Sequence, residues 1–315
     1  MGVFVWLPLI LPLTALPIAR LAEQHLHPRI ATRLLAVVGA LLALCSTLCL
    51  GLLMVVGTAQ LPGNPLPDSW ADPEVRAAVP YDEKAGVVAI GALAAVLAAC
   101  GRTVLRHVRL RVRANRALAA APSVVEDGVA VLPDPEPYAY ALPGAPGRVV
   151  VSTAMCDCLD AGERRALIAH ERAHLAARHH RYLLAVHLAA RANPFLRPLR
   201  TAVSYSTERW ADEEAARVVG DRRVVAIAVG KAALYTHRGP DASAGFAAFA
   251  APAGPVPRRV EALLAPVEPV RLWPPSSAHV ALAALVATVG TAASALSSLN
   301  AAVTLVGILH AATPL

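Results

Sequence analysis

The chain contains both long uncharged apolar segments and a stretch in which short apolar runs alternate with charged residues. Segments almost free of charge, of membrane-spanning length or close to it, lie at roughly residues 3–19, 34–58, 85–101 and 278–297. Between the last two, short apolar runs are interrupted by charged residues, as in ordinary helices and strands. The pattern predicts a mainly α membrane protein with about four transmembrane helices: a membrane region over residues 1–101, an inserted domain over residues 102–275, and a C-terminal transmembrane helix and tail over residues 276–315.

The first and last of these segments each leave a choice open. The first contains Pro8, Pro12 and Pro17, which a span tolerates when neighbouring helices satisfy the freed carbonyl groups. A signal peptide is the alternative, but the segment lacks a basic start and "LAEQHLHPR" after it is a poor cleavage site, so we expect a span. No Asp, Glu, Lys or Arg follows Arg271, which allows either one long tilted helix or a span with an apolar end.

The distribution of basic residues predicts the orientation of the spans. The connection between the first two carries Arg20, Arg29 and Arg33 against Glu23, whereas the next connection is acidic. Because basic loops stay on the cytosolic side of the cell membrane, we expect both termini to be external and residues 102–275 to be cytosolic. The arginine-rich run "GRTVLRHVRLRVRANR" abuts a span and lacks interleaved aromatic residues. We therefore interpret it as a contact with the anionic inner leaflet of the lipid bilayer and expect no direct binding of nucleic acid.

Composition agrees with a membrane protein that carries one cytosolic domain. The chain is 56% hydrophobic and 16% charged, which is too apolar for an ordinary soluble domain and too interrupted for a pure transporter. Cys156 and Cys158 lie in the cytosolic part, where thiols stay reduced. Their "CDC" spacing does not match a structural zinc site, which needs two ligand pairs at wider spacing.

The predicted cytosolic domain changes from strands to helices along its length. Residues 129–153 contain short β-type runs between Pro and Gly turns and predict two or three strands of a small sheet, with an exposed edge near 148–153 for an extended substrate. Asp160 and Glu163 predict a capping box that opens one helix reaching Asn193. Two further helices are expected over about 201–218 and 222–236, and residues 235–257 are expected to form an irregular loop.

The first of these helices carries the pattern H-E-x-x-H at His170, Glu171 and His174. Histidines four residues apart share one helix face and can bind a single zinc ion, while Glu171 can reach a water molecule on that metal. Catalytic zinc takes three protein ligands, and Glu208 on the next predicted helix is placed to be the third. Asp212 would share its face and accept the outer N–H of a ligating histidine. The alternative is that "ERWADEE" is only a solvated acidic face.

His179 and His180 follow the motif closely and must be weighed as ligands. His180 stands where a metzincin has its third histidine, but such a site needs a turn at position 177, and Ala177 lies in strongly helical sequence. We therefore expect both histidines to be exposed or at the domain surface.

Two motifs together resemble known zinc peptidases. "AHERAH" followed by "ERWAD" is similar to the HtpX and CAAX-protease type of gluzincin, and the order of spans and domain resembles the BlaR/MecR-type antirepressor peptidases. The resemblance implies a zincin-like cytosolic α+β domain with one zinc ion per chain on His170, His174 and Glu208, and Glu171 as the base. It also implies a protein substrate such as a DNA-binding repressor or the peptidase itself. This chain ends at Leu315 without the extracellular penicillin-binding domain, so sensing of β-lactams is not implied.

The expected activity is hydrolysis of peptide bonds by a membrane-anchored zinc endopeptidase. Zinc polarises the scissile carbonyl, and Glu171 moves a proton from water to the leaving amine. No oxyanion donor can be named, although Arg217, Arg222, Arg223 and Lys231 are candidates alongside a purely solvated role. The alternatives are a catalytically silent signalling receptor that retains the peptidase fold, and a membrane scaffold or transport component. Transport is disfavoured because no predicted span carries an ionisable pair.

Overall fold

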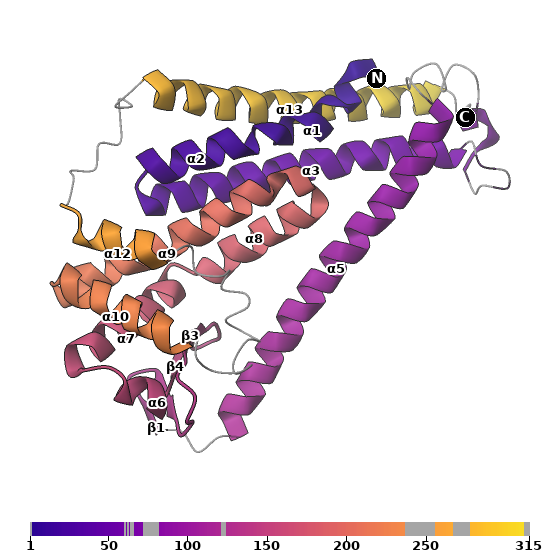
Figure 1. The fold of residues 1–315 in the computed structure, drawn as a ribbon. Coiled ribbons are helices and arrows are strands. Elements are labelled where there is room, and N and C mark those ends of the chain that lie inside the picture. The colour runs from indigo at the N-terminus through magenta and orange to yellow at the C-terminus, as the bar shows by residue number, and fades with distance from the viewer. Residues whose placement is uncertain are drawn as a thin grey trace.

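A computed structural model describes most of the chain as helices, with one small sheet (Figure 1). The described residues are 2–59, 61, 63, 66–71, 82–120, 124–236, 256–266 and 278–311. The predicted irregular loop over 235–257 lies almost entirely outside them. The prediction of a mainly helical protein is thereby confirmed, with a small sheet among the described residues.

Three described helices are long and apolar enough to cross a membrane. The candidate spans are Pro28–Ala59, Lys84–Ala120 and Ala284–Ala311, and they lie in helices α3 (Pro28–Ala59), α5 (Asp82–Ala120) and α13 (Ala278–Ala311). The segment predicted as the first span is not among them. It is divided into η1 (Gly2–Val5), α1 (Leu7–Ile10), η2 (Leu11–Thr14) and α2 (Ala15–His25). Its prolines lack the backbone N–H that a continuous helix needs, which accounts for the breaks. The fourth predicted transmembrane helix therefore stays a prediction.

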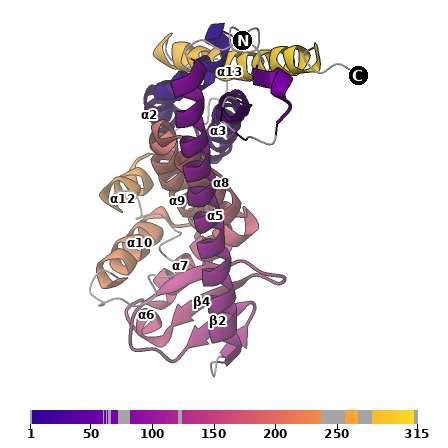
Figure 2. The same ribbon diagram turned by 90° about the vertical axis from the view of Figure 1, so that its right-hand side faces the viewer.

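These helices form a bundle from which one member diverges. Figure 1 shows α13, α1 with α2, and α3 running side by side, while α5 leaves them at a slant. Gly57 of α3 and Gly86 of α5 meet backbone to backbone, with no room for a Cβ atom on either. The two helices therefore touch at this crossing and separate from it, and η3 (Asp68–Ala71) lies in the connection between them. A second view shows the remaining elements stacked below the bundle along α5 (Figure 2).

The sheet contains four strands in the order β1-β2-β4-β3. They are β1 (Val124–Glu126), β2 (Val129–Leu132), β3 (Ala139–Leu142) and β4 (Arg148–Ser152). β1 and β2 form a hairpin through Asp127 and Gly128, both at positive φ, and β2 and β4 are parallel. β4 also pairs antiparallel with β3, so both of its edges are occupied. The exposed edge predicted near 148–153 is therefore wrong, because β3 is the outer strand on that side.

The helices that follow match the predicted order with one correction. They are α6 (Thr153–Asp157), α7 (Ala161–Ala176), α8 (His179–Ala192), η4 (Pro194–Leu196), α9 (Arg197–Val219), α10 (Arg222–Thr236) and α12 (Val256–Leu264). The capping box of Asp160 and Glu163 opens α7 as predicted. The single helix expected to reach Asn193 is instead broken, because α7 ends at Ala176 and Arg178 adopts a left-handed conformation with φ 55°. Contacts of His179, described below, override the local helical preference.

The hairpin of α8 and α9 packs on α3, one of the candidate spans. Val186, Leu196 and Leu199 share one buried cluster with Leu35 and Leu42 of α3. At the tip of the hairpin, the buried Asn193 donates a hydrogen bond of 3.1 Å from Nδ2 to Ser46 Oγ of α3. The Ser46 hydroxyl is itself 2.8 Å from the carbonyl oxygens of Pro8 and Leu42. The hairpin and α3 thus share a hydrophobic core. The division into domains that was drawn from hydropathy stays a prediction.

Candidate metal centre

Helices α7 and α9 bring two histidines and one glutamate together. His170 and His174 are one turn apart on α7, and Glu208 faces them from α9. The Nε2 atoms of the two histidines are 3.1 Å apart. Glu208 Oε2 lies 3.4 Å from His170 Nε2, and Oε1 lies 3.4 Å from His174 Nε2. One potential ligand atom from each residue lies within 4.8 Å of the others, so all three could bind the same ion.

This donor set fits zinc. Two imidazole nitrogens and one carboxylate oxygen are the ligands of a common type of catalytic zinc site, which leaves the fourth position for water or substrate. The two Nε2 atoms face each other with no residue between them, an arrangement that a shared cation would stabilise. The three side chains are also largely shielded from solvent, with exposed fractions of 8%, 14% and 12%. The protein therefore offers a buried, preformed set of three donors that could hold a zinc ion and leave its fourth position open.

A buried arginine neutralises the acidic side of the site. Arg259 of α12 makes two hydrogen bonds to the fully buried Asp212, at 2.8 Å to Oδ2 and 2.6 Å to Oδ1. Its Nη1 lies 3.0 Å from Glu208 Oε2. Burial opposes ionisation of both carboxyl groups, but the guanidinium holds the pKa of Glu208 well below its usual range and also lowers that of Asp212. Both side chains are therefore carboxylates, as metal coordination and its support require.

Asp212 lies against the side of His170 that faces away from the other donors. Its Oδ1 is 3.0 Å from His170 Nδ1. Burial lowers the pKa of His170, but Asp212 and Glu208 outweigh this effect and raise the pKa to about 10. At His174 Nδ1 the nearest described partner is a ring nitrogen of His179 and not a carboxylate, and burial lowers the pKa of His174 to about 4. The two histidines thus differ in the group that orients them.

Glu171 follows the donor His170 directly in the sequence of α7. Burial raises the pKa of Glu171 to about 7, although the positive charge of His170 and a hydrogen bond with the backbone of Ala141 lower it. Ala141 belongs to β3, the outer strand of the sheet. A carboxyl group with a pKa near neutrality can both accept and release a proton, as a general acid and base must.

The prediction that His179 is exposed is wrong. His179 is 1% exposed, and its Nδ1 lies 2.8 Å from His174 Nδ1. Its ring packs on Trp210 with the ring centroids 4.7 Å apart. Burial lowers the pKa of His179 to about 2, so the ring is neutral. His180, in contrast, is only partly buried and does not belong to the group of potential ligands.

The basic residues that the sequence offered as oxyanion donors lie outside the candidate metal centre. Arg259, which does contact it, was not predicted. Arg217 pairs with Glu214, Arg222 pairs with Glu213, and Lys231 pairs with Glu163. Arg223 lies at the exposed start of α10. Arg259 could have been noticed in "PRRVEALL", where helical spacing of apolar residues places it on the same face as Leu263. Its sequence distance from Asp212 concealed the contact.

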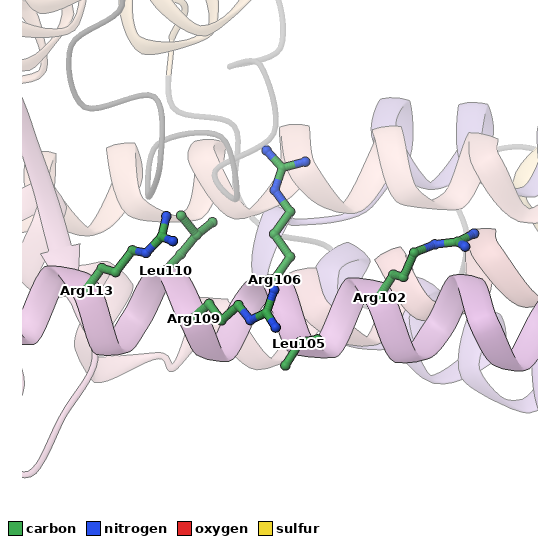
Figure 3. A pocket seen from close by; sticks show the side chains of 6 residues that line it. All are labelled: Arg102, Leu105, Arg106, Arg109, Leu110 and Arg113. Atoms are coloured by element: carbon green, nitrogen blue, oxygen red, sulfur yellow. The ribbon is translucent and has the colours of Figure 1, made fainter.

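An arginine-lined surface hollow lies away from these donors. It has a volume of about 300 Å³ on α5, and Figure 3 shows its lining residues, which are Arg102, Leu105, Arg106, Arg109, Leu110 and Arg113. None of these residues belongs to the candidate metal centre. The hollow instead belongs to the basic segment that follows the third predicted span.

The comparison with protein families gives an independent indication of the chemistry. Residues 105–193 match the model of Peptidase family M48. The match includes His170, Glu171 and His174 and ends before Glu208. Together with the His/His/Glu group, it supports a zincin-type metallopeptidase. No curated protein and no solved structure matched the chain.

Proposed function

We propose that this protein is a membrane-anchored zinc endopeptidase that cleaves a protein substrate on the cytosolic side. The observation that carries the proposal is the convergence of His170, His174 and Glu208 beside Glu171. The match to Peptidase family M48 and the three candidate spans support the two halves of the proposal, peptidase and membrane anchor.

Each group of the site has a distinct part in the proposed reaction. His170, His174 and Glu208 would hold one zinc ion, which would supply a Lewis acid for the scissile carbonyl and for water. Glu171 takes a proton from the attacking water molecule and delivers it to the leaving nitrogen. Asp212 holds His170, and Arg259 keeps both Asp212 and Glu208 ionised in a buried environment.

The substrate backbone binds along β3. One edge of β3 pairs with β4, and the other is not paired with any strand of the described chain. An extended peptide can therefore add to this edge by main-chain hydrogen bonds, beside the residue that contacts Glu171. The resemblance to the BlaR/MecR layout makes a DNA-binding repressor one candidate substrate.

The membrane arrangement in this proposal places both termini outside the cell. The arginine-lined surface of α5 then faces the anionic inner leaflet, where guanidinium groups bind lipid phosphates. Leu105 and Leu110 lie among these arginines and suit the boundary between head groups and acyl chains.

The proposal is tested by replacing the base while keeping the donors. Glu171→Gln should retain about one zinc ion per chain and lose peptide hydrolysis, since Glu171 moves the proton and is not a ligand. Glu261→Gln, an exposed glutamate on α12, is the matched control and should keep both properties. Full hydrolysis by the Glu171 variant contradicts the mechanism. A wild-type protein that binds zinc but cleaves nothing in a comparison of cellular protein fragments supports the silent receptor instead.

A further inference from the structure

His179 has no part in the reaction described above, yet it contacts a proposed zinc donor. Its Nδ1 lies 2.8 Å from Nδ1 of His174, while Nε2 of His174 faces His170 and Glu208. The two ring nitrogens of His174 therefore have separate surroundings. One faces the other donors, and the other faces a second histidine.

Either ring could donate in this contact, but binding of a metal through His174 Nε2 leaves only one arrangement of protons. A histidine that binds a metal through Nε2 carries its remaining proton on Nδ1 and donates it to an outer partner. The partner of His174 is His179 Nδ1, which must then be an unprotonated acceptor, with the proton of His179 on Nε2. His179 Nε2 is buried and has no hydrogen-bond partner among the described residues. No donor at Nε2 therefore favours the opposite tautomer, which would carry its proton on Nδ1.

The break between α7 and α8 is what allows the contact. In a continuous helix, residues five positions apart lie about 140° apart around the axis, and their side chains diverge. Here Arg178 turns the chain through a left-handed conformation, and α8 begins at His179. The turn directs the His179 ring back against His174.

The Trp210 ring also packs against the ring of His179. Trp210 of α9 contacts it with a centroid separation of 4.7 Å, and the Trp210 ring is covered by two arginines of α3. The guanidinium carbons of Arg29 and Arg33 lie 5.6 and 5.3 Å from the Trp210 ring centroid, within the range of cation–π attraction. The ring that faces His174 is thus confined by α8, α9 and the start of α3.

We propose that His179 is a positioning residue that accepts the Nδ1 proton of His174 and so fixes the tautomer in which Nε2 points to the metal. Trp210, with Arg29 and Arg33, keeps the ring of His179 in place. His179 therefore does for His174 what Asp212 does for His170, but without adding a negative charge. This inference rests on the proposed zinc site and assigns a residue outside the donor set to it.

Paired substitutions separate the acceptor from the packing. His179→Phe keeps an aromatic ring against Trp210 but leaves the His174 proton without an acceptor, whereas His179→Asn retains an acceptor oxygen near the position of Nδ1. The measurement is zinc affinity of the full chain in detergent, by competition with a chelator of known affinity, together with the visible absorption of the cobalt-substituted protein. His179→Phe should bind zinc about 10–100-fold more weakly and alter the cobalt spectrum, as expected for loss of an outer-shell partner. His179→Asn and the neighbouring control His180→Phe should stay close to wild type.

Zinc binding by wild type tests the proposed function, and the difference between wild type and the His179 variants tests the positioning role. If wild type binds no zinc, the proposed function fails. If wild type and His179→Phe bind zinc equally, or if His179→Asn is as weak as His179→Phe, only the positioning role is overturned. A measurement on the unaltered protein covers the case in which a variant does not fold. Nitrogen NMR of ¹⁵N-histidine-labelled, zinc-loaded wild type should show His179 unprotonated on Nδ1, and a proton on that atom overturns the inference.

Discussion

At the scale of single residues, the site depends on a buried network of opposite charges. Arg259 contacts both Glu208 and Asp212, and all three side chains are largely or completely buried. Removing charges from water is costly, and removing one partner leaves the others uncompensated. The arginine is therefore as important for the local structure as the donors that it stabilises.

Replacing Arg259 should destabilise the protein strongly. Arg259→Met leaves two buried carboxylates without their cation and should lower the free energy of unfolding by about 3–5 kcal/mol. Arg258→Met is the control, because Arg258 is about half exposed, pairs with Glu23 at 3.4 Å and covers the Tyr205 ring. An exposed pair of this kind contributes about 0–1 kcal/mol. Denaturant unfolding in detergent without added zinc measures both, and equal effects would contradict the assigned network.

At the scale of elements, the break between α7 and α8 is the feature that shapes the site. Arg178 holds the left-handed conformation at the break, which costs a residue with a side chain roughly 1–2 kcal/mol compared with the right-handed helix. Contacts made by His179 on the far side of the break offset this cost. Glycine adopts the same conformation without that steric penalty.

Arg178→Gly should therefore be tolerated or raise the free energy of unfolding, by up to about 1 kcal/mol. Arg165→Gly, at an exposed position inside α7, should lower it by a similar amount because glycine weakens a helix interior. Thermal unfolding of the two variants shows the difference in sign. A loss of stability in both would mean that the conformation at Arg178 is not as described.

The sequence predicted much of this part of the fold, for identifiable physical reasons. The capping box of α7 and the extent of α10 depend on local patterns, and both were predicted correctly. The break at Arg178 and the burial of His179 depend on packing against Trp210, which no local pattern reveals. Arg259 was missed because its partner Asp212 lies far away in the sequence. His170 and His174 were grouped because helical spacing places them on one face, and Glu208 was added because the next predicted helix folds back over the first. Their role as zinc ligands stays a prediction.

In the whole molecule, the helices that carry the proposed peptidase site pack directly on α3, one of the candidate spans. The hairpin of α8 and α9 shares a buried cluster with α3, and Arg29 and Arg33 of α3 cover Trp210 beside the site. The crossing of α3 and α5 at Gly57 and Gly86 sets the angle between the two helices that flank this hairpin.

Changing that crossing should disturb the whole protein. Gly57→Val forces side-chain atoms into the backbone of Gly86 and should lower the free energy of unfolding by about 1–3 kcal/mol or more. Gly51→Val lies on the same helix, where an added Cβ meets nothing within 4 Å, and should have little effect. Unfolding in detergent, followed by circular dichroism, tests the pair. Equal stability of the two variants would show that the helices do not cross at Gly57.

In the proposed site, His170, His174 and Glu208 bind one zinc ion that joins α7 to α9. This binding is tested most directly by zinc titration of purified wild type, Glu208→Ala and His180→Ala under the same conditions. We expect about one zinc ion per chain for wild type and for His180→Ala, and strongly weakened binding for Glu208→Ala, because catalytic zinc needs its third protein ligand. Loss of zinc in the His180 variant with full binding by the Glu208 variant would contradict the account.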